Sequence, residues 1–359
     1  MVDLQLLDIF RGKRVLVTGH TGFKGSWLFW WLRRLGADVR GYALAPQTTP
    51  SLYEALALPA TLSVIADIND ATALSREIQA FEPEFVFHLA AQPLVRKSYR
   101  APLDTFQTNV MGTAHVLEAI RMLPGKCTTV LITTDKVYQN KEWVYPYRET
   151  DTLGGHDPYS ASKACAELLI SSYQQSFFPL SAYSTHQKAI ASARAGNVIG
   201  GGDWSEDRLI PDMVKAFSSG QAMQIRNPDA VRPWQHVLEP LAGYLMLAAL
   251  LHRDAVRYAG GWNFGPYNDD NLPVSAVAAN ASELWGSGIV NINKDANAPH
   301  EARLLRLDIS KVVGELGWKP RIPVKTAIAR TINWYKEFYN GAAVDRLLEE
   351  DINYYESLF

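Results

Sequence analysis

Short apolar runs alternate with helical patterns along the first half of the chain. Runs rich in Val, Leu, Ile and Phe predict buried strands, which fall at 14–19, 38–44, 61–66, 85–89 and 129–133. Apolar residues with helical spacing predict helices between these runs, after residue 22, over 71–81 and over 103–122. Because such alternation builds a parallel sheet with helices on both faces, we predict an α/β fold with a doubly wound parallel sheet of the Rossmann type.

The pattern continues through one more long helix and changes near residue 190. That helix is expected from Pro158, which is favourable in a first helical turn, to Phe178, and a sixth strand is expected over 191–195. The chain then mixes glycine-dense turns, prolines and short elements. We therefore expect a Rossmann domain over 1–190 and a smaller mixed α/β substrate-binding lobe over 191–359. Apolar runs near 232–265 predict a return of the chain to the first domain there.

Composition and charge exclude several classes of protein. The 359 residues are 47% hydrophobic and 20% charged, which allows a large core and two lobes. A formal net charge of −2 without a dense basic run argues against nucleic-acid binding. Two cysteines, Cys127 and Cys165, exclude a disulfide framework, and the eight histidines are scattered, so no metal is predicted. No apolar run reaches about 18 residues, so we expect a soluble cytoplasmic protein that makes no membrane contact.

Three glycines spaced three apart follow the first predicted strand. They lie in the segment Gly19-His20-Thr21-Gly22-Phe23-Lys24-Gly25, between that strand and the first helix. A lone glycine triplet is a weak signal, and an ordinary strand-to-helix turn is the competing interpretation. At this place, however, the backbone must turn tightly and can approach a pyrophosphate at the helix N-terminus. The context therefore favours a dinucleotide-binding turn.

Two polar segments are predicted to meet at the carboxyl edge of the sheet. The segment Thr133-Thr134-Asp135-Lys136 ends the fifth strand, at the edge where open α/β sheets place their ligands. Tyr159 and Lys163 lie one turn apart at the start of the long helix. Alone, such a tyrosine and lysine are more often a solvated helix face, and a surface ion pair is the competing interpretation of the Asp-Lys pair. Together, the two segments predict a hydroxyl, a carboxyl group, a phenol and two amines facing one small volume.

In order and spacing, these motifs resemble the extended short-chain dehydrogenase/reductases, whose catalytic signature is the Tyr-xxx-Lys pair. The resemblance implies bound NAD, with Tyr159 removing a hydroxyl proton and Lys163 stabilising the phenolate. The cofactor would lie along the glycine turn, the ends of the third, fourth and fifth strands, the helix from residue 103 and the catalytic pair. The residues implied to bind it are Gly19, Thr21, Gly22, Phe23, Lys24, Gly25, Asp67, Ile68, Leu89, Ala90, Ala91, Gln92, Asn109, Thr133, Tyr159 and Lys163.

A narrower resemblance concerns the Asp-Lys pair at 135–136. Most nucleotide-sugar 4,6-dehydratases of this family carry Asp-Glu here, whereas Asp-Lys resembles their CDP-glucose branch, as do the segments 19–27, 92–95, 194–204 and 232–237. The resemblance implies dehydration of CDP-D-glucose to CDP-4-keto-6-deoxy-D-glucose by internal hydride transfer through NAD, for deoxysugar and lipopolysaccharide O-antigen synthesis. The catalytic residues that it implies are Thr134, Asp135, Lys136, Tyr159 and Lys163. A second acid and base beside the hydride-transfer set suit the loss of water next to a transient ketone.

Asn197, Arg208 and Arg232 are the expected substrate-binding residues. Guanidinium groups suit a diphosphate, and the resemblance assigns Asn197 and Arg232 to the substrate. Arg208 fits a salt bridge between the lobes equally well. The segment 300–303 (His-Glu-Ala-Arg) resembles either a stretch near the nucleotide in this family or a simple loop.

Several alternatives stay open. No acid follows the second strand, where the family commonly holds the adenosine ribose with a carboxylate, and Arg40 lies close by, so NAD over NADP rests on the resemblance. The resemblance also implies a homodimer through the helices that begin at 103 and 158, although an intramolecular apolar face would give the same pattern. The rival functions are a nucleotide-sugar 4-epimerase, a 4,6-dehydratase of another nucleotide sugar, and a non-catalytic nucleotide-binding sensor or scaffold.

Overall fold

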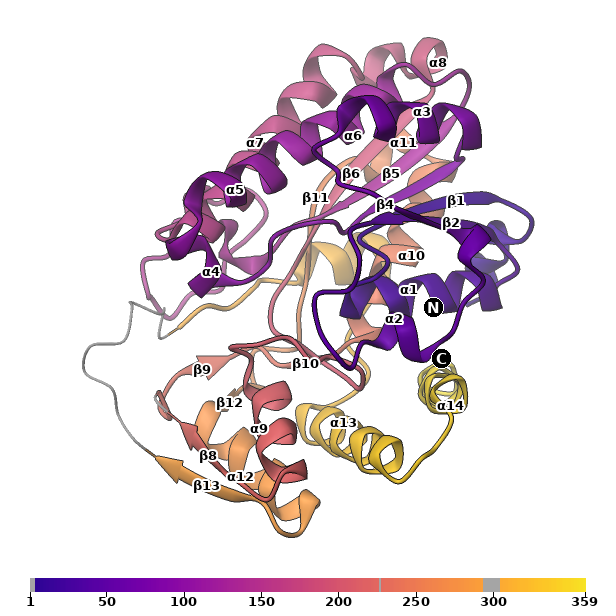
Figure 1. Ribbon diagram of the computed structural model, residues 1–359. Coiled ribbons are helices and arrows are strands. Elements are labelled where there is room, and N and C mark those ends of the chain that lie inside the picture. The colour runs from indigo at the N-terminus through magenta and orange to yellow at the C-terminus, as the bar shows by residue number, and fades with distance from the viewer. Residues whose placement is uncertain (1–3, 226, 293–303) are drawn as a thin grey trace.

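Seven parallel strands form the central sheet of the protein (Figure 1). The computed structural model describes residues 4–225, 227–292 and 304–359, so the segment 300–303 lies outside the described residues. The strand order is β11-β6-β5-β4-β1-β2-β3, and every neighbouring pair runs parallel. The strands are β1 (Arg14–Thr18), β2 (Asp38–Ala43), β3 (Ser63–Ile65), β4 (Phe85–His88), β5 (Cys127–Ile132), β6 (Lys188–Ala195) and β11 (Gly260–Phe264). The prediction of a doubly wound Rossmann sheet is confirmed.

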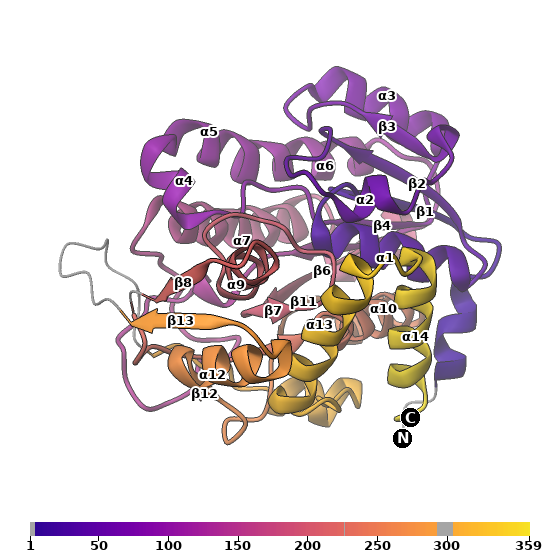
Figure 2. The same ribbon diagram turned by 60° about the horizontal axis from the view of Figure 1, so that its bottom comes forward.

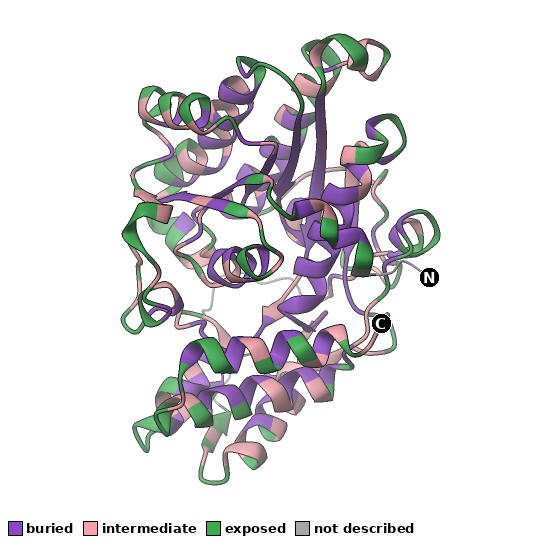
Figure 3. Ribbon diagram, turned by 90° about the vertical axis from the view of Figure 1, so that its right-hand side faces the viewer, coloured by how far each residue is buried: buried purple, intermediate pink, exposed green. Residues whose placement is uncertain are grey.

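Helices cover both faces of this sheet because its strands alternate their side chains between two cores. In β1, Val15 and Val17 pack into the core beneath the sheet, while Leu16 packs into the opposite core. The first core includes α1 (Phe23–Arg34) and α10 (Leu238–Arg253), and the second is closed by α3 (Ala71–Phe81) and α6 (Gly112–Arg121). The helix α7 (Pro158–Ser176) lies beside α6 over β5 and β6. Figure 3 shows the strands and inner helix faces as the buried part of the molecule.

Several predicted elements differ in detail from the structure. The third strand, expected from residue 61, begins at Ser63 after the 3-10 turn η2 (Ala60–Leu62), and the fifth, expected from residue 129, begins at Cys127. The helix expected over 103–122 is three consecutive pieces: α5 (Pro102–Phe106), the π-helical η3 (Gln107–Met111) and α6. The sixth strand begins at residue 188 instead of 191, although a lysine at the start of a buried strand is unfavourable. The structure accommodates Lys188 because its ammonium group donates a hydrogen bond to the Gly125 carbonyl.

Most of the chain after β6 forms a smaller group of elements below the sheet (Figures 1 and 2). Three two-stranded ladders pair β7 (Val198–Ile199) with β10 (Gln235–His236), β8 (Ala222–Ile225) with β13 (Ile289–Ile292), and β9 (Val231–Arg232) with β12 (Leu272–Pro273). The longer helices of this part are α9 (Leu209–Ser218), α12 (Val274–Trp285), α13 (Val324–Tyr339) and α14 (Val344–Glu356). Because α10 and β11 belong to the central sheet and its core, the chain passes between the two parts more than once. The domain division at residue 190 stays a prediction.

Short elements complete the described chain. They are η1 (Leu4–Phe10), α2 (Leu52–Ala55), η2 (Ala60–Leu62), α4 (Val95–Arg100), η4 (Asp135–Val137), η5 (Leu180–Ala182), α8 (Tyr183–His186), α11 (Ala255–Tyr258) and η6 (Val312–Leu316). Within residues 4–225, 227–292 and 304–359, no helix is both long enough and apolar enough to cross a membrane.

Candidate active site

The glycine turn between β1 and α1 is packed so closely that two of its glycines cannot be replaced. Gly19 has a φ of +75°, and a Cβ there would lie 2.6 Å from the Ala90 nitrogen. A Cβ at Gly25 would lie 2.0 Å from the Gly19 carbonyl oxygen. At Gly22, by contrast, a Cβ would meet only that same oxygen, at 3.5 Å. The fold itself therefore does not require glycine at position 22, and the bare backbone there leaves room for a ligand at the N-terminus of α1, which has no side-chain cap.

The other residues expected to bind a cofactor line the neighbouring strand ends. The Thr21 hydroxyl donates to the Leu44 carbonyl after β2, 2.8 Å away. Asp67 is exposed after β3, and Ile68 is buried against Gly112. The loop 89–92 follows β4, whose last residue, His88, hydrogen-bonds Thr18 and Thr113 at 2.7 and 3.1 Å. These contacts fix the carboxyl ends of β1 and β4 side by side.

Asn109 connects three parts of the site. Its side-chain oxygen accepts a hydrogen bond from the Gln92 nitrogen at 2.8 Å, and its amide nitrogen donates to the Gln92 carbonyl and to the Ser162 hydroxyl. Ser162 in turn donates to the Tyr159 carbonyl at 2.7 Å. The wider turn of η3 thus presents an asparagine that holds the loop after β4 against the start of α7.

The two polar segments predicted to meet do lie together. Thr134 follows β5, Tyr159 and Lys163 occupy the first turns of α7, and a hydrogen bond joins the Tyr159 and Thr134 side chains. The Lys163 ammonium donates to the carbonyl of Ile132 at 3.1 Å, which anchors α7 to the end of β5. The Asp157 carboxylate caps the first turn of α7, because it accepts a hydrogen bond from the Ser160 nitrogen. This capped turn sets the orientation of Tyr159.

Asp135 and Lys136 occupy the turn η4 that follows. One carboxylate oxygen of Asp135 accepts from the Thr134 hydroxyl at 3.0 Å and lies 3.4 Å from the Lys136 ammonium. The other oxygen is buried without a hydrogen-bond partner among the described residues. The Asp135 side chain is 1% exposed and that of Lys136 32%, so the acid lies at the bottom of the pocket and the amine at its wall.

Burial dominates the protonation of Tyr159 and Lys163. It raises the pKa of Tyr159 to about 12, against the lowering effect of the hydrogen bond to Thr134. Burial also lowers the pKa of Lys163 to about 8, partly offset by the nearby Glu167 carboxylate. Lys24 faces the same volume, and burial together with the positive charges of Arg208 and Lys163 lowers its pKa to about 7. The protein alone therefore keeps the Tyr159 phenol protonated at neutral pH, and removing its proton requires added positive charge.

A pocket of about 760 Å³ joins this cluster to the smaller lobe. Asn197 and Arg232 line it, and the Asn197 side-chain oxygen is buried without a hydrogen-bond partner among the described residues. Arg208 also lines the pocket, but its guanidinium pairs with Asp203 of the same loop at 3.1 Å. The ion pair of Arg208 is thus local and does not connect the two lobes.

Sequence reasoning missed a different ion pair across this pocket. Arg96 of α4 and Asp207 of the loop before α9 lie 3.2 Å apart, and both line the pocket. Asp207 has a φ of +58°, a left-handed conformation that is unusual for a residue other than glycine. Arg96 directly follows the segment 92–95 noted in the sequence, but nothing in the local pattern pairs it with a residue more than one hundred positions away.

The sheet and the arrangement of these residues define the class of protein. A parallel Rossmann sheet with a glycine turn after its first strand, and a helix that presents Tyr159 and Lys163 beside its fifth, is a short-chain dehydrogenase/reductase of the extended type. Residues 16–331 match the model of the family described as GDP-mannose 4,6 dehydratase, and the chain belongs to this family.

Within this family, the chain is similar to 4,6-dehydratases of two nucleotide sugars. The chain is 49% identical over 335 residues to a CDP-glucose 4,6-dehydratase of Salmonella typhimurium, with 93% of each chain covered. It is 30% identical to a dTDP-glucose 4,6-dehydratase of Streptomyces antibioticus, covering 90% of this chain and 92% of the relative.

Solved structures share the fold. The structure of DesIV, a dTDP-glucose 4,6-dehydratase of Streptomyces venezuelae with NAD and TYD bound, superposes with a TM-score of 0.73 at 26% identity, covering 91% of this chain and 98% of that one. A UDP-glucose 4-epimerase of Thermus thermophilus in complex with NAD gives a TM-score of 0.76 at 24% identity, covering 90% and 99%.

Proposed function

We propose that this protein dehydrates CDP-D-glucose to CDP-4-keto-6-deoxy-D-glucose with the help of bound NAD. The observation that carries the proposal is the placing of Asp135 and Lys136 beside the Tyr159–Thr134 hydrogen bond in one pocket. The hydride-transfer set alone would suit an epimerase equally well, whereas an additional buried acid and neighbouring amine suit elimination of water. The 49% identity to a CDP-glucose 4,6-dehydratase supports CDP-glucose as the substrate.

NAD fits the residues at the sheet edge. The open backbone at Gly22 and the uncapped N-terminus of α1 would receive the pyrophosphate, and the loop 89–92 would run beside the nicotinamide end. The Arg40 guanidinium, the nearest candidate for a 2′-phosphate, is paired with Glu77 at 2.8 Å and stacks over Phe81. Because that guanidinium is already engaged on α3, the site supports NAD over NADP. The chemistry that bound NAD supplies is the acceptance and return of a hydride.

Residues of α7 and of the end of β5 carry out the first half of the reaction. Tyr159, hydrogen-bonded to Thr134, removes the proton from the sugar C4 hydroxyl. The ammonium of Lys163 stabilises the phenolate that Tyr159 must become. Because burial raises the pKa of Tyr159 to about 12 in the protein alone, bound NAD would supply further positive charge that favours the phenolate.

Residues of the turn η4 carry out the second half of the reaction, the loss of water. A ketone at C4 acidifies the C5 hydrogen, which Lys136 in its neutral form removes, while Asp135 in its protonated form donates a proton to the departing C6 hydroxyl. Water leaves and a C5=C6 double bond remains. Once the hydride taken from C4 is returned to C6, the Lys136 ammonium gives its proton back to C5, which completes the 4-keto-6-deoxy sugar. The buried Asp135 oxygen without a partner is available for that donation. Asn197, Arg232 and Arg208 hold the nucleotide diphosphate; Arg208 does so by exchanging Asp203 for phosphate oxygens.

Product analysis with purified protein tests the proposal. We expect CDP-D-glucose to yield the 4-keto-6-deoxy product, followed by its absorbance in alkali, and dTDP-, GDP- and UDP-glucose to yield far less. A C4 epimer that keeps its C6 hydroxyl would indicate an epimerase instead. Absence of turnover with all four nucleotides would favour a non-catalytic nucleotide-binding protein.

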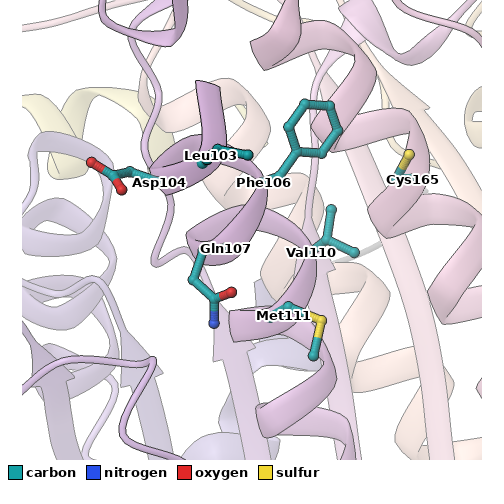
Figure 4. Close-up of a pocket in the computed structure, with 7 residues that line it drawn as sticks. All are labelled: Leu103, Asp104, Phe106, Gln107, Val110, Met111 and Cys165. Atoms are coloured by element: carbon teal, nitrogen blue, oxygen red, sulfur yellow. The ribbon is translucent and has the colours of Figure 1, made fainter. Parts of the chain in front are cut away.

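We also propose a homodimer through the outer face of α5, η3 and α7. A shallow apolar groove lies there (Figure 4), lined by Leu103, Asp104, Phe106, Gln107, Val110, Met111 and Cys165. Leu103 and Met111 in the groove are 81% and 44% exposed, and Leu168, three positions after Cys165 on α7, is exposed as well. Helices with such a face bury it best against a second copy of themselves, because two-fold symmetry pairs like surfaces.

Leu103→Glu should convert the dimer to a monomer, because two carboxylates would be brought into an apolar interface. The mass in solution, measured by light scattering after size-exclusion chromatography, checks this. Val256→Glu is the matched control, since Val256 is 61% exposed on α11, away from this face. A wild-type protein that runs as a monomer would contradict the proposal.

A further inference from the structure

A buried ion pair lies directly behind the candidate active site. Arg194 of β6 and Glu167 of α7 approach within 2.8 Å, and their side chains are only 6% and 4% exposed. The contact is bidentate, because a second guanidinium nitrogen of Arg194 donates to the other carboxylate oxygen at 3.0 Å. Glu167 lies one helical turn after Lys163 on the same helix. The reaction outlined above uses neither charge.

The remaining bonds of Glu167 join the helix to two strands. One carboxylate oxygen also accepts from the Thr133 hydroxyl, and the other accepts from the Ser192 hydroxyl at 2.8 Å. Thr133 is the residue immediately before Thr134, at the end of β5. A single carboxylate therefore connects the helix that carries Tyr159 to the strand end that precedes the acid and amine of η4.

Arg194 secures the far end of the same segment. Its third nitrogen donates to the Tyr138 hydroxyl at 2.8 Å and to the Glu149 carbonyl at 3.1 Å. Tyr138 directly follows η4 as its C-cap residue, and its hydroxyl donates to the side-chain oxygen of Asn263 in β11 at 2.7 Å. The ion pair thus contacts residue 133 on one side and residue 138 on the other, with residues 134–136 between them.

We propose that the Glu167–Arg194 pair positions the two halves of the active site relative to each other. The inference rests on the proposed function, because a dehydratase must bring the hydride-transfer set and the elimination pair to neighbouring carbons of one sugar. A displacement of about 1 Å between reacting groups can cost about 100-fold in rate. The pair sets that spacing through four hydrogen bonds to the carboxylate, all of them removed from solvent.

The Glu167–Arg194 pair also affects the pKa of Lys163, which gives a second measurable effect. Burial pushes the pKa of Glu167 upward, but the charge and hydrogen bonds of Arg194, together with the hydrogen bonds from Thr133 and Ser192, outweigh burial and keep the pKa below its ordinary value, so the group stays a carboxylate. That carboxylate raises the pKa of Lys163 against the effect of burial. Among the residues that the structure describes, Tyr159 one turn earlier on α7, Lys24 of the glycine turn and His88 of β4 also face Lys163. Loss of the Glu167 charge should therefore make Lys163 neutral at a lower pH.

Two variants at Glu167 separate positioning from simple support of the fold. Glu167→Asp keeps the charge but shortens the side chain, and we expect kcat with CDP-D-glucose to fall about 10- to 100-fold with little change in KM. Glu167→Gln keeps the length but removes the charge, and we expect the alkaline limb of the pH profile to move to lower pH. Asp351→Asn is the matched control, since it weakens the ion pair with Arg330 between α14 and α13; it should lower the melting temperature but leave kcat and the pH profile unchanged.

Folded Glu167 variants with the wild-type kcat and pH profile would overturn the proposal. If neither variant folds, Ser192→Ala decides, because it removes one bond to the carboxylate and keeps both charges; an unchanged kcat would then refute positioning. A wild-type protein inactive with every glucose nucleotide would refute the proposed function instead. In that case, titration of the Lys163 Cε carbon by NMR in 13C-lysine-labelled protein tests the pair alone, and an identical midpoint in wild type and Glu167→Gln overturns it.

Discussion

At the scale of single residues, the pair formed by Asp135 and Lys136 separates the proposed dehydration from epimerisation. In the proposed mechanism Thr134, Tyr159 and Lys163 serve the hydride transfer, and none of these three residues is assigned to the removal of water. Asp135 lies deep in the pocket with one oxygen bound and one unpartnered, which suits proton donation to a leaving group. The amine of Lys136 lies at the pocket wall, where it can reach a neighbouring carbon of the same sugar.

Lys136→Met should uncouple the two halves of the reaction. Methionine keeps the length of the side chain but cannot accept a proton, so turnover should fall at least about 100-fold. Substrate-dependent absorbance of reduced cofactor at 340 nm should still appear, since Tyr159 is intact. Normal product formation in this variant would remove Lys136 from the mechanism.

Tyr159→Phe should block the first step. The variant keeps the ring but loses the hydroxyl that Thr134 holds, so no group remains to take the C4 hydroxyl proton. We expect the 340 nm signal in a single turnover to form at least about 100-fold more slowly. A variant that still reduced bound cofactor at the ordinary rate would contradict the assignment.

At the scale of elements, buried carboxylates fix helices that the sheet alone does not hold. Glu239, in the first turn of α10, is fully buried and accepts hydrogen bonds from the backbone nitrogens of Arg321 and Ile322 and from the Tyr355 hydroxyl of α14. Burial raises its pKa to about 7. One side chain therefore joins α10, the loop before α13 and the C-terminal helix.

Glu239→Ala should destabilise the protein strongly, because two buried N–H groups and a buried hydroxyl lose their acceptor. The expected loss is about 3 kcal/mol, measured as the free energy of unfolding in urea. Glu239→Gln keeps one acceptor oxygen and should lose less. Equal stability of the alanine variant and the wild type would show that water replaces the carboxylate at this site.

At the scale of the whole molecule, buried histidines make stability depend on pH. Burial lowers the pKa of His88 and His236 to about 3 and that of His20 to about 4, against 6.5 in an unfolded chain. Between about pH 4 and 6.5 the unfolded chain thus binds protons that the folded chain does not, so stability falls as the pH falls through this window. The raised pKa values of Glu239 and Asp351, about 7 and about 6, act in the opposite direction, but the pKa values of His88 and His236 are shifted further from their ordinary value.

We therefore expect the melting temperature to decrease from pH 7 to pH 5. Differential scanning calorimetry at these two pH values and at pH 6 measures the effect. His236→Asn should flatten the dependence, because it removes one group whose pKa differs strongly between the folded and unfolded chains. A melting temperature that rises on acidification would mean that the two carboxyl groups outweigh the histidines.

The alternation of strands and helices could be predicted because each element in the first half of the chain buries one face. The apolar residues of that face recur with the spacing of a strand or of a helix. The α3 helix over 71–81 and the central strands follow directly from those periods. The hydrophobic pattern failed to predict the start of the sixth strand, where burial competes with local preference. Lys188 starts this strand only because its ammonium group donates a hydrogen bond to the Gly125 carbonyl. The π-helical η3 likewise follows from contacts of Asn109 with Gln92 and Ser162, which no local period encodes.

The sequence by itself determined the sheet, the glycine turn and the candidate groups at 133–136, 159 and 163, because spacing within one strand or one helix fixes which side chains share a face. Only the tertiary structure decided which distant groups meet. It paired Arg96 with Asp207 and Glu167 with Arg194, whereas Arg208 pairs with the nearby Asp203 of its own loop. Such pairs depend on how strands and loops far apart in the chain are brought together, and their energy depends on burial, which exists only once the chain has folded.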